Sequence, residues 1–174
     1  NERKVTVDIV QSVIFKTGFH GPEEYIWSPE YPNLFSVELT LIDSDSQRER
    51  DFIKSYFGMR KIHSENGIIY LNNKPYYQKL ILDQGYWPKS LLTAPSDADY
   101  RQDITLAKQM GFNGCRKHQK LEDPRFLYWA DKLGYLVWEE CSSTPLFTTQ
   151  SQIAILDSWK ETYLRDRNHP CIVA

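Results

Sequence analysis

The chain has no excess of charge of either sign. Its 174 residues include 21 Lys and Arg against 23 Asp and Glu, which gives a formal net charge of −2 at pH 7. This balance excludes the strongly basic surface of a nucleic-acid-binding domain and the polybasic patch of a membrane-surface protein. No apolar run approaches the roughly 20 residues that a transmembrane helix needs. We therefore expect neither nucleic acid nor a membrane among its partners.

Cysteine is scarce as well. Cys115, Cys141 and Cys171 are far apart, odd in number and without CxxC spacing. This pattern indicates neither a disulfide framework nor a zinc site. Each cysteine lies in or beside an apolar stretch, so we expect three small core residues rather than reactive thiols.

The chain also lacks an initiating Met and a basic-then-apolar leader. It starts at Asn1, and its last four residues, 171–174, form an apolar run. A strand needs its full length and its partners, so we expect a piece of a larger protein. The compartment and the oligomeric state of that protein are left open.

Aromatic residues, by contrast, are abundant: they make up 14% of the sequence, with 5 Trp and 11 Tyr. A share of this size fits a surface that faces sugars or another protein, but a thick aromatic core gives the same figure. The aromatic content therefore leaves both explanations open.

The first half of the chain has the pattern of β-strands. Residues 35–41 alternate apolar and polar side chains, which predicts a half-buried strand. A polar turn at 43–50 leads to a second predicted strand at 52–60, with a bulge expected at Gly58. Two more strands are predicted at 5–10 and 12–15. Such spacing predicts a β-sandwich, with too few strands for a complete one.

A hairpin is predicted between the two halves. Residues 68–71 are apolar and lead into Asn72 and Asn73. Because Asn tolerates positive φ, this pair predicts a tight turn. The partner strand is expected from residue 76 onward.

The second half alternates short apolar runs with helical patterns. Ser96 with Asp99 resembles a capping box, and Gly111 stands where the first helix should end. Asp123 before a proline predicts the start of a second helix, which Gly134 ends. A third amphipathic helix is predicted from Ile153, Leu156, Trp159 and Tyr163. Buried strands are predicted at 79–82, 112–116, 135–138 and 171–174.

Short strands that alternate with helices predict a parallel sheet with right-handed crossovers. The sheet is expected to be either an open doubly wound sheet or a (β/α)8 barrel. No glycine-rich phosphate loop follows the first strand, which argues against nucleotide binding. A complete barrel takes about 250 residues, so a barrel here would be its first half.

Ionisable and aromatic side chains follow three consecutive predicted strands. They are Asp83, Tyr86 and Trp87 after the first, Arg116, Lys117 and His118 after the second, and Glu139 and Glu140 after the third. Each has a structural explanation when it is taken alone, as a turn residue, a cover for the end of the barrel or a solvated pair. Together they predict a shared site, because convergent charge is costly unless it is paired or used.

The chemistry of these groups points to sugars. Carboxylate pairs cleave glycosidic bonds, aromatic rings stack on sugar faces, and a fixed Arg keeps a carboxylate ionised. Glu139 and Glu140 are sequential, so on a strand they point to opposite faces. They cannot both belong to a catalytic pair.

Seven stretches, taken in order, resemble family 2 glycoside hydrolases, the group of β-galactosidases, β-glucuronidases and β-mannosidases. The stretches are WSP at 27–29 with PNLF at 32–35, YFGMRKI at 56–62, LNNKP at 71–75, LDQGYWP at 82–88, MGFNGCRKH at 110–118, DKLGY with VWEE between 131 and 140, and RDRNHP at 165–170. The resemblance runs over roughly residues 27–174. At 72–73 the family usually has Asn-Gly.

The resemblance implies an α/β fold with a β-sandwich: a partial immunoglobulin-like sandwich at 1–62, then the first half of a (β/α)8 TIM barrel at 63–174. It implies that Arg116 helps to position the nucleophile carboxylate. It also implies that His118 belongs to the sugar site, one residue closer to the Arg than in the family pattern, and that Glu140 lies near the active site.

The family's two catalytic Glu residues would both lie beyond residue 174, so no catalytic residue is expected within this chain. The substrate-binding or site-positioning residues that we predict are Asp83, Trp87, Arg116, His118 and Glu140. In some family members the Glu at the third strand binds a metal ion. Glu140 and His118 alone do not complete a coordination set, so we predict no metal ligands and no cofactor, with Mg²⁺ left open.

The sequence therefore predicts part of a retaining β-glycosidase, resembling β-galactosidases, that is inactive on its own and acts on a carbohydrate. The sugar itself cannot be predicted from these residues. The alternative is a non-catalytic carbohydrate-binding or interaction module, in which Arg116 and Glu140 pair for structural reasons.

Overall fold

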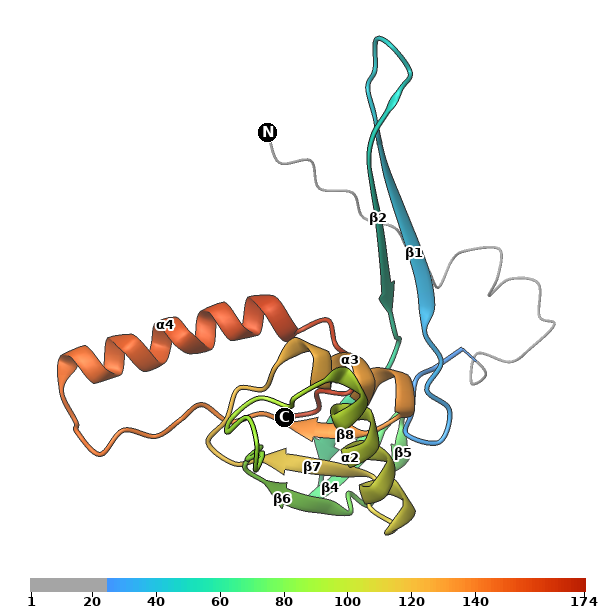
Figure 1. Cartoon of the computed structure of the whole chain (residues 1–174). Helices are drawn as coiled ribbons and strands as arrows, with labels where there is room; N and C mark the ends of the chain where they lie inside the picture. The colour runs from blue at the N-terminus through green and yellow to red at the C-terminus, as the bar shows by residue number, and fades with distance from the viewer. Residues whose placement is uncertain (1–24) are drawn as a thin grey trace.

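The computed structural model describes residues 25–174, and Figure 1 shows how their elements are arranged. A compact body of short strands and two helices carries two projecting arms, a long β-hairpin and a long helix. The strands predicted at 5–10 and 12–15 lie outside the described residues.

The first arm is the antiparallel pair β1 (Phe35–Ile42) and β2 (Glu49–Phe57). Its register places Phe35 opposite Phe57, with the two rings stacked at 5.1 Å between centroids. The strand predicted at 35–41 is confirmed, and the second strand begins and ends three residues earlier than predicted. The bulge lies at Leu41/Ile42 rather than at Gly58.

Gly58 follows β2, and a different physical reason accounts for glycine there. A Cβ atom at this position would lie 2.7 Å from Cγ of Pro170. The absence of a side chain therefore lets the end of the hairpin approach the segment that leads into the last residues of the body.

A three-stranded antiparallel sheet follows, made of β3 (Ile62–Glu65), β4 (Ile68–Leu71) and β5 (Lys74–Pro75). Asn72 and Asn73 have φ values of 53° and 64°, so the predicted Asn-Asn turn is confirmed. The partner strand begins at Lys74, earlier than predicted, and β3 was not predicted at all.

The centre of the body is a parallel sheet in the order β6 (Leu80–Asp83), β7 (Gly114–Lys117) and β8 (Leu136–Trp138). All three strands lie within a residue or two of their predicted positions. The sheet confirms the parallel pairing that the alternation of strands and helices predicts.

The last residues of the chain line up along β8 as the predicted fourth strand would. Val137 pairs with Ile172 in a parallel bridge. Val173 donates its N–H to the carbonyl of Val137 at 3.0 Å, and Glu139 donates to the carbonyl of Ala174 at 3.0 Å. These bonds extend the parallel sheet by one short segment.

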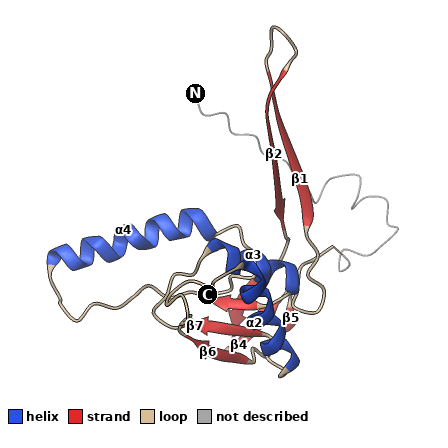
Figure 2. Ribbon diagram, in the orientation of Figure 1, coloured by secondary structure: helices blue, strands red, loops and turns tan. Residues whose placement is uncertain are grey.

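Two helices, α2 (Asp97–Gln109) and α3 (Pro124–Leu133), cover one face of this sheet (Figure 2). Their predicted caps are confirmed: Ser96 accepts from the N–H of Asp99, and Asp123 accepts from the N–H of Arg125. Buried apolar residues join the helices to the sheet, among them Tyr100, Ile104, Cys115, Phe126, Leu127, Val137 and Cys171. Cys115 and Cys171 are therefore core residues, as predicted, whereas Cys141 is only partly buried.

The second arm is α4 (Thr149–Asp166), which begins at a capping box on Thr148. The helix is present as predicted, but its apolar residues do not join the core. Ile153 is 55% exposed and Leu156 is 67% exposed, and the buried residues of the helix are Thr162 and Asp166. None of the helices in the described range is both long and apolar enough to cross a membrane.

The described residues thus form an α/β fold. They include one parallel sheet of three strands and two antiparallel sheets, of three strands and of two.

Candidate functional site

Arg116 and Glu140 form an ion pair on the face of the parallel sheet opposite the helices. Arg116 stands beside Leu82 and Trp138 in the register, so these side chains share one face. Its Nε donates a hydrogen bond to Oε1 of Glu140, and the N–H of Gln119 donates to Oε2 at 3.1 Å. The hydrogen bond from Arg116 and then the one from Gln119 lower the pKa of Glu140, which is therefore ionised.

His118 lies in the same group. The amide Nε2 of Gln84 is 2.9 Å from Nδ1 of the imidazole. His118 also lies close enough to Glu140 to influence the pKa of that carboxyl group. The structure therefore brings Arg116, His118 and Glu140 together at the carboxyl ends of β7 and β8, as the sequence predicts for strands in parallel.

A cavity of about 710 Å³ opens beside this group. His118 is part of its wall, whereas Arg116 and Glu140 are not. Its polar wall also includes Gln84, Tyr86, Gln119, Lys120 and Arg165. A hollow of this size is large enough for a small polar ligand.

Asp83 does not face the cavity or Arg116. Its Oδ2 lies 2.5 Å from Nζ of Lys117, and its Oδ1 accepts from the N–H of Gly85 at 2.7 Å. Lys117 in turn lies over the ring of Phe126 of α3, which places this ion pair on the side of the sheet that the helices cover.

Trp87 packs toward the core. Its ring meets Tyr100 edge to face at 5.7 Å, and its backbone exchanges two hydrogen bonds with Leu91. The ring that stands free in this loop is that of Tyr86, which is 71% exposed and lines the cavity. The sequence analysis named Trp87 rather than Tyr86 as a site residue, but it is Tyr86 that lines the cavity.

Glu139 and Glu140 contact different partners, as the alternation of a strand predicts. Glu139 is buried, and one of its oxygens accepts from the N–H of Glu122 at 3.2 Å. Burial raises the pKa of Glu139 to about 7, and the charge of Asp166 adds to the effect. This carboxyl group therefore titrates near neutral pH, unlike its neighbour Glu140.

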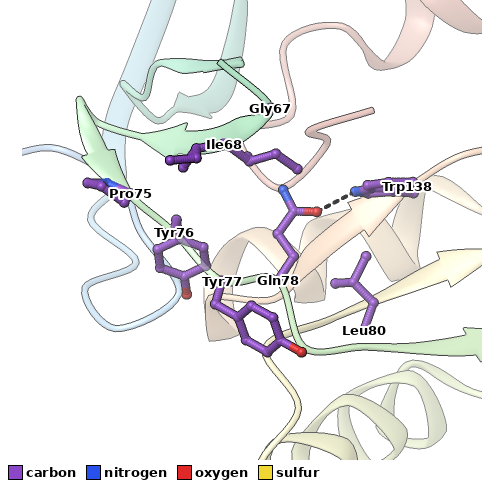
Figure 3. A pocket seen from close by; sticks show the side chains of 9 residues that line it. Gly67, Ile68, Pro75, Tyr76, Tyr77, Gln78, Leu80 and Trp138 are labelled. Carbon is purple, nitrogen blue, oxygen red and sulfur yellow. Dashed lines mark hydrogen bonds between the residues drawn. The ribbon is translucent and has the colours of Figure 1, made fainter. Parts of the chain in front are cut away.

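A second cavity, of about 630 Å³, lies on the open face of the sheet (Figure 3). Its wall joins Ile68 of β4 to Leu80 of β6 and Trp138 of β8. Nε1 of Trp138 donates to Oε1 of Gln78 at 2.8 Å across this space. The antiparallel sheet that contains β4 and β5 and the parallel sheet thus line one concave, largely apolar surface.

Asp131, His169 and Cys171 have metal-ligand atoms within 4.8 Å of one another. Protein groups already use these atoms: Asp131 accepts from Tyr56 Oη at 2.8 Å and from the N–H of Cys171 at 2.9 Å. Nδ1 of His169 lies 2.6 Å from the same carboxylate. Burial raises the pKa of the Cys171 thiol, which keeps it protonated. The cluster is a hydrogen-bonded joint between the hairpin arm and the body.

Glu140 does not offer a metal site either. Both of its oxygens accept hydrogen bonds from Arg116 and Gln119, and Gln84 faces the ring of His118. A divalent cation needs free carboxylate or imidazole donors, so the residues present here do not fit one.

Comparison with protein families gives one match. Residues 62–174 match the family model described as glycosyl hydrolases family 2, TIM barrel domain. The matched range begins at β3 and includes the whole parallel sheet.

Comparison with curated proteins finds β-galactosidases. The chain is 28% identical to the β-galactosidase of Photobacterium profundum over 171 residues, which is 92% of this chain and 16% of that protein. It is 25% identical to the β-galactosidase of Kluyveromyces lactis, over 94% of this chain and 19% of the relative. The chain thus spans less than a fifth of the length of these relatives.

Comparison with solved structures finds β-glucuronidases and β-galacturonidases. A β-glucuronidase from Bacteroides uniformis superposes with a TM-score of 0.76 at 29% identity, over 84% of this chain and 18% of that one. A β-galacturonidase from Eisenbergiella tayi superposes with a TM-score of 0.73 at 26% identity, over 87% of this chain and 27% of that one.

Proposed function

Because the chain belongs to glycosyl hydrolase family 2, we propose that it is part of a retaining β-glycosidase that hydrolyses O-glycosidic bonds in carbohydrates. The observation that carries the proposal is the cluster of Arg116, His118 and Glu140 at the carboxyl ends of parallel strands. In barrels of this kind, the groups that act on substrate lie at that end.

We further propose the division into a partial immunoglobulin-like sandwich at 1–62 and the first half of a (β/α)8 barrel at 63–174. The family match, which starts at residue 62, supports this boundary. The change from antiparallel to parallel pairing after β5 supports it too. The exposed apolar faces of both arms are explained if further strands and helices of a longer protein cover them.

In the proposed reaction, two Glu residues encoded outside this chain would carry out the chemistry. One would attack the anomeric carbon while the other protonates the leaving oxygen, and water would then release the sugar from the covalent intermediate. The role of this chain is to supply the charged and polar side chains that orient those two Glu residues and set their ionisation.

Arg116 has the geometry for that role. Glu140 accepts from its Nε, and 44% of the side chain is exposed on the open face. Its remaining N–H groups can therefore hold a further carboxylate in the ionised form that a nucleophile needs. Glu140 fixes the guanidinium, and Gln119 fixes Glu140.

His118 is placed for the sugar itself. Gln84 occupies the Nδ1 side of the ring, which leaves the Nε2 side for a ligand in the cavity. A neutral imidazole that accepts at Nδ1 donates at Nε2, which suits a sugar hydroxyl.

The test is Arg116→Ala in the complete protein, assayed with nitrophenyl β-galactoside and β-glucuronide. We expect kcat to fall about 100-fold or more, with the unfolding midpoint close to that of the wild type. Arg48→Ala on the exposed turn of the hairpin arm is the matched control and should leave kcat unchanged. If Arg116→Ala lowers the free energy of unfolding by as much as it raises the activation free energy, the Arg116–Glu140 pair is structural instead.

The exposed rings of Tyr31, Tyr77 and Tyr86 favour a second candidate, a non-catalytic carbohydrate-binding module. Calorimetry with oligosaccharides separates the two. Millimolar or tighter binding by a complete protein that hydrolyses none of its ligands would favour the module.

A further inference from the structure

Lys117 is the most deeply buried cation of the described residues, with a side chain that is 2% exposed. It directly follows Arg116 and points to the opposite face of the sheet. Its Nζ lies 2.5 Å from Oδ2 of Asp83, 2.7 Å from Oε2 of Glu122 and 3.8 Å from the centroid of the Phe126 ring. The strand ends thus carry ion pairs on both faces, one exposed and one enclosed.

Glu122 gathers further contacts from its own loop. It is 1% exposed, and its Oε1 accepts from the N–H of Asp123 at 2.9 Å and lies 3.3 Å from Nζ of Lys120. Its own N–H donates to Glu139 at the end of β8. Through Glu122, the buried ion group reaches the end of the third strand.

The same group joins the loops that follow β6 and β7. Asp83 accepts from the N–H of Gly85 with its carboxylate and from the N–H of His118 with its carbonyl, at 2.7 and 2.8 Å. Lys120 donates to the carbonyl of Gly85 at 3.0 Å and also to that of Leu92. The two loops are therefore bonded to one another, and Leu92 and Lys120 of these loops also line the cavity.

Gly85 shows how closely the loops approach. Its φ is +65°, and a Cβ there would lie 2.4 Å from Nζ of Lys120. A side chain at this position would be strained by the positive φ and would displace the side-chain ends of Lys120 and Glu122.

From these contacts we propose that the buried Lys117 and Glu122 form, with the partly buried Asp83, a positioning triad for the site. The triad holds loop 84–95 and loop 118–123 together, so that Gln84 and His118 stay paired at the wall of the cavity. This inference rests on the proposed function, and it gives Lys117 a role through the loops rather than through contact with the sugar.

Stability alone does not account for two buried charges, Lys117 and Glu122, beside the partly buried Asp83. Burial by itself lowers the pKa of Lys117, but Cys115 and the carboxylates of Glu122 and Asp83 together outweigh burial, so the pKa is raised and the cation persists. A buried ion group of this kind is frequently no more stabilising than apolar residues of the same volume. What apolar residues cannot supply is a set of directed bonds to two loops.

The test uses the complete protein with the three substitutions Asp83→Asn, Lys117→Met and Glu122→Gln combined. Lys117→Met alone leaves Asp83 without its cation and Glu122 with Lys120 only, and is expected to unfold, whereas the combined variant removes the three charges of the triad at similar volume. We expect it to keep a wild-type unfolding midpoint but to lose about tenfold or more in kcat. Hydrogen exchange should become faster in both loops and stay slow in the sheet. Asp43→Asn with Arg50→Met removes an exposed ion pair on the hairpin arm and is the matched control.

The proposed positioning role is wrong if the triple variant folds and keeps the wild-type kcat. It is also wrong if the variant folds and keeps the wild-type hydrogen-exchange rates in both loops. A triple variant that does not fold shows that the charges are needed for stability and overturns it as well. If the wild-type protein hydrolyses no β-glycoside, the proposed function fails on that result. The exchange rates of the two loops then decide whether the triad positions them.

Discussion

The body and the two arms are built from similar apolar patterns, but only the body buries them. Leu127 in α3 is fully buried, whereas Leu156 in α4 is 67% exposed and Leu41 in the hairpin is 63% exposed. All three stand in regularly spaced apolar rows. The comparison teaches that periodicity identifies which face of an element is apolar, whereas the partner of that face depends on contacts far away in the sequence.

The largest expected difference between body and arm is in core packing. Leu127→Ala should lower the free energy of unfolding by about 2–5 kcal/mol, because the side chain is fully enclosed and leaves a cavity. Leu156→Ala should change it by less than about 0.5 kcal/mol. Urea unfolding of both variants checks this, and equal losses would contradict the division into body and arm.

The next effect concerns pH within the body. The pKa of Glu139 is about 7 in the folded state against an ordinary value of 4.5, so the native state binds the extra proton between these values. Stability should therefore fall as pH rises from about 4.5 to 7, with a slope of at most about 1.4 kcal/mol per pH unit from this group.

Glu139→Gln should remove that slope and stabilise the protein at pH 8. The exposed Glu38 of the hairpin arm supplies the control, since Glu38→Gln should leave the pH dependence intact. The measurement is the free energy of unfolding of both variants at pH 5 and at pH 8. An unchanged slope in Glu139→Gln would show that another group titrates.

The smallest effect concerns the joint between arm and body. Tyr56→Phe removes the hydrogen bond to the buried carboxylate of Asp131 and should lower the free energy of unfolding by about 1–2 kcal/mol. Tyr31→Phe, on a ring that is 70% exposed, should have no measurable effect. If both variants unfold like the wild type, Tyr56 does not stabilise the joint.

Local signals in the sequence were sufficient for much of the body. Ser96, Asp123 and Gly134 mark helix ends because capping depends on neighbouring residues. The three parallel strands could be predicted because each is a short run of apolar residues, which is also a local signal. The strand β3 was missed because it is four residues long and partly polar, although the Asn66-Gly67 turn that follows it is a usable hairpin signal.

Contacts between distant residues could not be predicted in this way. Asp83 and Lys117 are 34 positions apart, and Tyr56 and Asp131 are 75 apart. Sequence reasoning named Asp83 as a substrate-binding or site-positioning residue because it stands at the end of a strand, and the alternation of that strand turns its side chain toward the helices rather than the cavity. Placing the ionisable residues on one face or the other would have needed the register of the sheet, which the structure supplies.

The most direct test of the account follows the first sugar that the complete protein releases from a β-glycoside, by proton NMR at early times. A retaining β-glycosidase releases the β-anomer first, and the α-anomer appears only later as the sugar equilibrates. The account predicts this order for the wild type and a much slower release in Arg116→Ala. Initial release of the α-anomer, or no hydrolysis of any β-glycoside tested, would contradict it.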